Sequence, residues 1–232
     1  MRVNFLLLLG VLTFFSVAVD AQAKKEEKNL FDAKLRPRNL SDSALLDLVQ
    51  KQTFYYFWDF AHPVSGMARE RSDMSFGYGY ETVAVGGTGF GIMSVIIATE
   101  RKWITRDTAA KFLLKMVNFL LKAESYHGAF PHWMDGTTGK TIPFSRKDDG
   151  ADLVETSYLF QGLLCARQYF NANNEIENEL RTRINWMWPD IEWSWFTQGQ
   201  DVLYWHWSPN NGWSMNNAIR GFNECLIAYI LA

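Results

Sequence analysis

The chain has 232 residues, a formal net charge of −2 and two cysteines. Because its charge is nearly balanced and no basic stripe occurs, the composition excludes a nucleic-acid partner. Cys165 and Cys225 lie in apolar runs, which predicts buried free thiols rather than a disulfide scaffold or a cysteine metal site. Aromatic residues make up 16% of the chain and include 10 Trp, more than one small core readily absorbs. Some ring faces are therefore expected to line a cleft.

The chain begins with MRVNFLLLLGVLTFFSVAVDAQA. One arginine precedes an apolar run of roughly 15 residues, and Ala21 and Ala23 form a small-residue cleavage pattern. Since a membrane span needs about 20 apolar residues, this segment predicts a secretory signal peptide over residues 1–23. A linker is expected over 24–40 and one domain over 41–232. The mature protein would be periplasmic or secreted, with no stable membrane span after cleavage.

Helical periodicity predicts buried helices that alternate with polar-faced ones along the domain. Ser41 and Thr105 are the expected N-caps of two polar-faced helices. The expected helices cover 41–60, 89–100, 105–124, 151–170, 174–188 and 216–232, with a small hairpin within 126–144. Strands are too few for a sheet. The fold class is therefore all-α, with helical hairpins whose inner helices line the axis of an α/α barrel or toroid.

Three such hairpins do not close a barrel of six. The last helix ends on CLIAYILA without a cap, a glycine stop or a polar tail. We therefore expect the N-terminal half of a larger toroid, truncated to about three hairpins, in which inner segments such as IAYILA are exposed. The alternative is a complete small helical domain.

The segment SRKDDGADLVETSYL places four carboxylates close together: Asp148, Asp149, Asp152 and Glu155. A DDxxD motif that holds magnesium on a diphosphate is disfavoured, because these acids precede the apolar helix and the protein is expected to be exported. A helix start accounts for one or two acids, since Asp149 or Asp152 could cap the helix. It does not account for Glu155, whose neighbours are those of a buried helix.

Glu224 repeats this pattern near the start of the last apolar helix. If two inner helices bring acids to one rim, the carboxylates can perform acid and base catalysis on a glycosidic bond. Asp152 and Glu155 are three residues apart and are expected on one helix face. Because an inverting pair needs about 6.5–9.5 Å between carboxyl groups, Glu224 paired with Asp152 or Glu155 fits better.

Three segments together resemble glycoside hydrolase family 144, the bacterial endo-β-1,2-glucanases of the glycoamylase-like group. They are TGFGIMSVIIATERKWITR, DDGADLVETSYLFQGLLCARQYF and LYWHWSPNNGWSMNNAIRGFNECLIAYILA. The resemblance implies an (α/α)6 barrel, inverting hydrolysis of β-1,2-glucans and no metal or organic cofactor. It also implies catalytic roles for Asp148, Asp152, Glu155 and Glu224. Glu224 is the expected general acid, and Asp152 or Glu155 the base.

Several further side chains are candidates for binding the sugar. The tryptophans Trp133, Trp205, Trp207 and Trp213 are expected in loops beside the acids, where they would act as platforms unless they pack in the core. His132 and His206 are candidates to hydrogen-bond sugar hydroxyls, and the scattered histidines argue against a zinc site. Arg69 and Arg71 are expected to be solvated rather than paired with the acids.

The expected function is hydrolysis of a β-glucan, with an oligo- or polysaccharide as the partner and no cofactor. Two alternatives stay open. A non-catalytic glycan-binding protein would use the same aromatic residues and would retain glycan without producing new reducing ends. An exo-acting β-glucosidase or glucoamylase-like enzyme would differ in the length of its products.

Overall fold

The structure is a computed structural model that describes residues 37–72 and 80–232. A boundary between two compact units falls between Leu48 and Val49, and the packing described below is that of Val49–Ala232. The predicted signal peptide, residues 1–23, and most of the predicted linker lie outside the described residues. Within the described ranges, no helix combines the length and the apolar character that crossing a bilayer requires.

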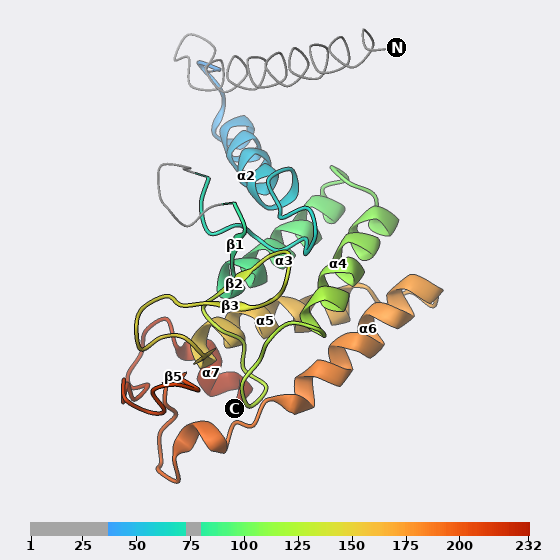
Figure 1. The fold of residues 1–232 in the computed structure, drawn as a ribbon. Helices are drawn as coiled ribbons and strands as arrows, with labels where there is room; N and C mark the ends of the chain where they lie inside the picture. Colours follow the sequence, from blue (N-terminus) through green and yellow to red (C-terminus); the bar gives the residue numbers. More distant parts are fainter. Residues whose placement is uncertain (1–36, 73–79) are drawn as a thin grey trace, which may run out of the picture. The chain divides into compact units, whose positions relative to one another are not determined.

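Helices are the main secondary structure of the described residues, as predicted, and they cover about half of them (Figure 1). The α-helices are α2 (Asp42–Trp58), α3 (Val85–Glu100), α4 (Arg106–Leu120), α5 (Leu153–Tyr169), α6 (Glu175–Met187) and α7 (Leu226–Leu231), and two 3-10 turns, η1 (Trp188–Asp190) and η2 (Trp195–Thr197), follow α6. Thr105 caps α4 as expected, because its side chain accepts a hydrogen bond from the Thr108 backbone N–H.

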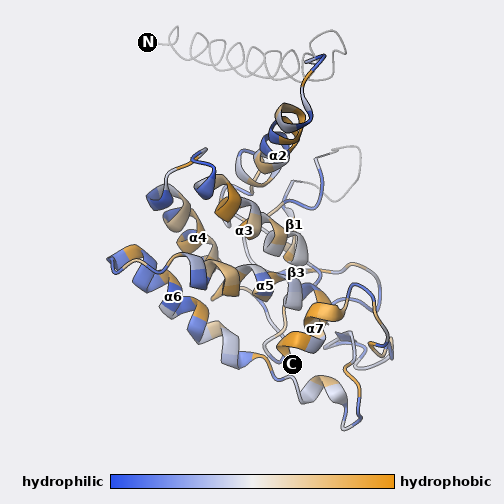
Figure 2. Ribbon diagram, turned by 180° about the vertical axis from the view of Figure 1, so that it is seen from behind, coloured by the Kyte–Doolittle hydropathy of each residue, from blue (hydrophilic) through white to orange (hydrophobic). Residues whose placement is uncertain are grey.

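Helices α3 and α5 form the inner layer and pack along each other, while α4 packs against α6 (Figure 1). The contact between α3 and α5 depends on two glycines. A Cβ atom on Gly89 would lie 2.0 Å from the Tyr158 backbone oxygen, and one on Gly162 would lie 2.4 Å from the Gly89 oxygen. Only glycine allows the two backbones to approach this closely. Helix α6 carries many hydrophilic residues, as an outer helix should (Figure 2).

Two small antiparallel sheets correct the expectation that the chain has too few strands for a sheet. The first has the order β1-β2-β3, and the second pairs β4 with β5. The strands are β1 (Thr82–Ala84), β2 (Trp133–Asp135), β3 (Thr141–Ile142), β4 (Ala151–Asp152) and β5 (His206–Trp207). The predicted hairpin is confirmed as β2–β3. Strands of two or three residues are too short to show a sequence alternation.

The prediction of a helix over 216–232 is wrong for its first half, because only α7 is helical. The backbone of the earlier residues is hydrogen-bonded to another segment: the Trp205 N–H donates to the Asn217 oxygen, and the Ile219 N–H donates to the Leu203 oxygen. The final apolar segment is exposed in part, since Ala228 is buried. Ile230 is 69% exposed, and α7 is strongly hydrophobic (Figure 2).

Candidate active site

Asp152 is the centre of the site and is completely buried. It is the N-cap of α5, so the expectation that it shares a helix face with Glu155 is corrected: it precedes the helix. Its Oδ1 accepts hydrogen bonds from the backbone N–H groups of Val154 and Glu155, at 3.0 and 2.9 Å. The indole Nε1–H of Trp205 donates to the same oxygen at 2.9 Å. These donors fix the carboxylate in one orientation.

The two small sheets bring His132 and His206 to the other oxygen of Asp152. In the β4–β5 pair, Asp152 stands directly opposite His206, and His206 Nε2 lies 3.3 Å from Asp152 Oδ2. His132 immediately precedes β2, and its Nδ1 lies 3.2 Å from the same oxygen. Asp148 joins this cluster, since its Oδ2 is 3.3 Å from His206 Nε2. The cluster therefore contains two carboxylates and two imidazoles.

The pKa values show that the cluster is a network of ion pairs. Burial by itself raises the pKa of Asp152, but the hydrogen bonds from His132 and His206 lower it to about 2. Burial lowers the pKa of His206, but its bonds to Asp148 and Asp152 outweigh this effect and raise it to about 9. The pKa of His132 is also raised, because its bond to Asp152 outweighs burial. At neutral pH, Asp152 is thus ionised and His206 is protonated.

Glu155 lies in the first turn of α5, and its side chain contacts the N-terminus of the neighbouring inner helix, α3. Its Oε2 accepts the backbone N–H of Gly86, in the first turn of α3, at 2.8 Å. A Cβ atom on Gly86 would lie 2.4 Å from that oxygen, so glycine is required for the contact. Burial and the charge of Asp152 raise the pKa of Glu155, and they outweigh the charge of His132 and the hydrogen bond from Gly86, which lower it. Glu155 therefore takes up a proton more readily than an ordinary glutamate.

Glu224 is exposed and lies just before α7, not in the first turns of a buried helix as expected. Its backbone carbonyl accepts a hydrogen bond from the Tyr158 hydroxyl on α5, at 2.7 Å. Its carboxylate charge adds to the causes that raise the pKa of Glu155. The structure thus brings Glu224 within electrostatic range of Glu155, although they are 69 positions apart in sequence.

His132, Asp148 and Asp152 offer ligand atoms that lie within 4.8 Å of one another, a spacing at which a metal ion could be held. Asp152 already has a charged partner here, because protonated His206 lies 3.3 Å from its Oδ2. The bond to Asp152 also raises the pKa of His132 against the effect of burial, which makes its imidazole a less available metal ligand. The arrangement fits an ion-pair network better than a vacant cation site.

Two other predicted polar groups have structural roles. Asp149 belongs to the acidic motif, but its carboxylate accepts hydrogen bonds from Ser208 and from the Asn210 amide and so anchors the loop after β5. Arg69 is not solvated as expected: its Nε donates to the Phe60 carbonyl at 3.2 Å. Its guanidinium also lies over the Phe60 ring, 5.1 Å from the centroid.

The predicted tryptophan platforms differ in their exposure. Trp133 lies in β2 rather than in a loop and is only 6% exposed, so its ring belongs to the packed interior. Trp207 and Trp213 are half-buried, and the ring centroid of each lies 6.2 Å from that of Trp195. Sequence reasoning missed Phe144, which is 48% exposed and stacks on His132 with 4.0 Å between ring centroids. No pattern marked it, because its position follows from the β2–β3 hairpin.

No family model matches the chain. The chain is 44% identical, over 99% of its own length, to an exo-β-1,2-glucooligosaccharide sophorohydrolase (non-reducing end) of Parabacteroides distasonis. An endo-β-1,2-glucanase from Chitinophaga pinensis, in complex with sophorotriose and glucose, is 52% identical with a TM-score of 0.80. Both of these similar proteins are named as β-1,2-glucan hydrolases. A candidate glucoamylase structure from Bacteroides uniformis is similar as well, at 58% identity and a TM-score of 0.80.

These comparisons confirm the resemblance that the sequence indicates. The match covers 83% of this chain for the Chitinophaga structure and 84% for the Bacteroides structure. The chain spans 32% of the length of the curated Parabacteroides relative and 47% of each of these two solved chains. The helices of this chain therefore correspond to part of a glucoamylase-like fold.

Proposed function

We propose that the site hydrolyses β-1,2-glucans by carboxylate acid and base catalysis, and that the chain acts as an endo-β-1,2-glucanase. The observation that carries the proposal is that the fold brings two acids from different elements together. The Tyr158 hydroxyl of α5, the helix that carries Glu155, donates to the Glu224 backbone carbonyl at 2.7 Å, and the charge of Glu224 helps to raise the pKa of Glu155. Similarity to relatives named as β-1,2-glucan hydrolases supports the substrate class. In this proposal, α2–α7 correspond to three hairpins of an (α/α)6 toroid.

In the proposed division of roles, Glu224 is the acid, as the family resemblance implies, and the environment of Glu155 suits it to be the base. Glu224 donates a proton to the glycosidic oxygen as the bond to the anomeric carbon breaks. Glu155 takes a proton from the water that attacks that carbon from the opposite face, which inverts its configuration. The raised pKa of Glu155, caused first by burial, makes it a stronger base than an ordinary glutamate. Solvent then returns the proton to Glu224 and removes one from Glu155.

Asp152 is better suited to positioning than to proton transfer. It is fully buried, and donors on both of its oxygens hold its pKa near 2, against the effect of burial. A carboxylate with so low a pKa is a weak base at neutral pH. We therefore assign to Asp152, with Asp148, the task of holding His132 and His206 at the rim. In this arrangement the exposed face of Phe144 is the nearest sugar platform.

The test is incubation of the chain with linear β-1,2-glucan, with chromatography of the products. Glu224→Gln and Glu155→Gln should each lower the rate by about 10²-fold or more, the usual contribution of a catalytic acid or base. Glu179→Gln is the matched control, because Glu179 pairs with Arg183 on the surface of α6. Full activity in both Glu224→Gln and Glu155→Gln would refute the proposal.

The product pattern decides between endo and exo action. Endo cleavage gives a spread of oligosaccharides from the start, whereas release of a single short product, as the name of the Parabacteroides relative implies for that protein, indicates exo action. Binding of glucan without new reducing ends would make the chain a glycan-binding protein instead. Export to the periplasm or beyond, with cleavage near Ala23, completes the proposal and is tested by N-terminal sequencing of the secreted protein.

A further inference from the structure

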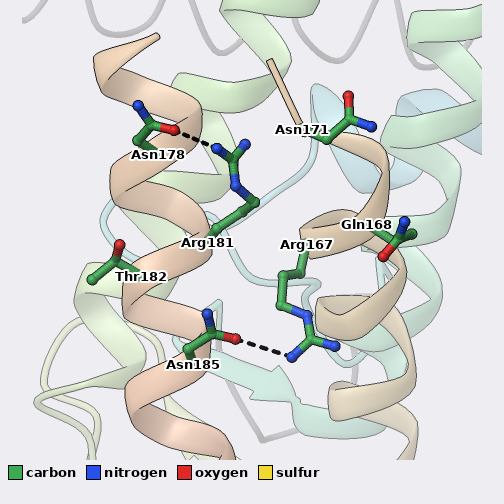
Figure 3. Close-up of a pocket in the computed structure, with 7 residues that line it drawn as sticks. All are labelled: Arg167, Gln168, Asn171, Asn178, Arg181, Thr182 and Asn185. Atoms are coloured by element: carbon green, nitrogen blue, oxygen red, sulfur yellow. Dashed lines mark hydrogen bonds between the residues drawn. The ribbon is translucent and has the colours of Figure 1, made fainter. Parts of the chain in front are cut away.

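A polar groove lies between α5 and α6, remote from the candidate active site (Figure 3). Its volume is about 550 Å³, and its lining consists of Arg167, Gln168, Asn171, Asn178, Arg181, Thr182 and Asn185. Asp152 caps the opposite end of α5. At 1.5 Å per residue, the 15 positions from Asp152 to Arg167 correspond to about 22 Å. The groove is therefore separate from the acidic cluster.

The groove is positively charged, because its lining contains two arginines and five neutral polar residues but no carboxylate. The acids of α6 that form ion pairs are matched with arginines that do not line the groove: Glu177 with Arg106, and Glu179 with Arg183. Both of these pairs are therefore neutral. The groove keeps the charge of its own two guanidinium groups.

The two guanidinium groups are oriented by neutral acceptors. Arg167 Nη1 donates to Asn185 Oδ1 at 3.0 Å, and Arg181 donates to Asn178 Oδ1 and to the Ala172 carbonyl. Both side chains reach into the space between the helices (Figure 3). An amide or carbonyl acceptor fixes the direction of a guanidinium group without cancelling its charge. Since a guanidinium group has five N–H donors, Arg167 retains donors for a ligand.

A purely structural role explains only part of this arrangement. Arg167 lies in the last turn of α5, where a cation interacts favourably with the helix dipole. Arg181 satisfies the Phe170 and Ala172 carbonyls in the turn before α6. Neither role explains why seven polar residues surround one groove without a carboxylate. A neutral sugar is disfavoured, because no aromatic ring lines the groove.

We propose that this groove binds an oxyanion of the phosphate or sulfate class, either free or carried by a sugar. Guanidinium forks match the geometry of such groups and bind them with charge-assisted, often bidentate hydrogen bonds. The side-chain amides of Gln168 and Asn171, on the α5 side of the groove, supply further donors. Because the groove is open to solvent, we expect a dissociation constant of about 1 mM.

The test is a titration of the full chain with inorganic phosphate and with sulfate, followed by NMR of the arginine side chains. Sodium chloride at equal ionic strength is the reference. Arg167→Gln should weaken phosphate binding about 10-fold or more, whereas Arg167→Lys, which keeps the charge but loses the fork, should weaken it less. Arg183→Gln is the matched control on α6, since Arg183 pairs with Glu179. It should bind phosphate as the parent does.

A titration with glucose 6-phosphate distinguishes a site for the free oxyanion from a site for an oxyanion carried by a sugar. Equal affinity for it and for inorganic phosphate indicates a site for the free ion, while affinity about 10-fold higher indicates a sugar-borne group. The proposal is overturned if chloride produces the same spectral changes, if Arg167→Gln binds as tightly as the parent, or if Arg183→Gln loses as much affinity. Because hydrolysis of β-1,2-glucan does not enter this test, its outcome is independent of the proposed enzymatic function.

Discussion

Replacing Gly86 by alanine tests how the fold positions Glu155. The new Cβ would lie 2.4 Å from Glu155 Oε2 and 2.9 Å from its Cδ, so the carboxylate must move by about 1 Å to reach ordinary contact distance. The hydrogen bond from the Gly86 N–H, at 2.8 Å, is then lost. A hydrogen bond to a charged group contributes about 1.5–3 kcal/mol. Alanine returns about 0.5–1 kcal/mol through its higher helix propensity. The variant should therefore unfold about 1–2 kcal/mol more easily.

Gly87→Ala is the matched control, because Gly87 is the next residue of α3. Its added Cβ would meet only the Cβ of Ala84, at 3.3 Å, so it receives the same gain in helix propensity without touching Glu155. We expect Gly87→Ala to be at least as stable as the parent. The two variants should thus differ by about 1.5–3 kcal/mol in urea unfolding, the contribution of the lost hydrogen bond.

The functional readout is the rate of β-1,2-glucan hydrolysis, together with the titration of the Glu155 carboxyl by carbon-13 NMR. A displacement of about 1 Å in a catalytic group lowers the rate about 10²-fold. Loss of the Gly86 hydrogen bond removes an effect that lowers the pKa of Glu155, so this pKa should rise further. A folded Gly86→Ala protein with the parent's rate and the parent's Glu155 pKa would show that this contact does not position the carboxylate.

Three further outcomes are expected. Stability in urea should be highest between about pH 4 and pH 6.5. Folding lowers the pKa of Asp152 from 3.8 to about 2, so its contribution to stability is lost as the pH falls through this range. Folding raises the pKa of His206 from 6.5 to about 9, so its contribution is lost as the pH rises through that range. His132 and Asp148 also contribute to these shifts, but the Asp152–His206 pair enters both and is counted once, which gives about 2–3 kcal/mol. A flat pH curve would contradict this. Glu155→Gln should melt at a higher temperature than the parent at pH 7. Folding raises the pKa of Glu155 above 4.5, so the ionised carboxylate lowers the stability of the folded protein at higher pH. A lower melting temperature for the variant would contradict this prediction. Phe144→Ala should weaken glucan binding several-fold in calorimetry with little change in stability, since the ring is 48% exposed, whereas Trp186→Ala, on an exposed ring of α6, should not.

The longer helices could be predicted from the local sequence pattern. Outer helices such as α4 have apolar residues at helical spacing on one face, and inner helices such as α3 are apolar on nearly all faces. Thr105 marked the start of α4, and the run before Glu100 marked α3. The final helix was predicted too long, because apolar composition alone does not show that its first residues are hydrogen-bonded to the segment around Trp205. The short strands were missed, since two residues carry no detectable period.

The sequence by itself determined that helices are the main secondary structure of this chain, that its acids gather near helix starts and that it resembles β-1,2-glucan hydrolases. Only the tertiary structure decided how each acid is held. Asp152 became a buried anchor because β5 sets His206 opposite it, and Glu155 remained available because its partner is a single backbone N–H from another helix. The physical reason is that a carboxylate's pKa depends on its burial and on charges brought close by distant segments, which neighbouring residues in the sequence do not specify.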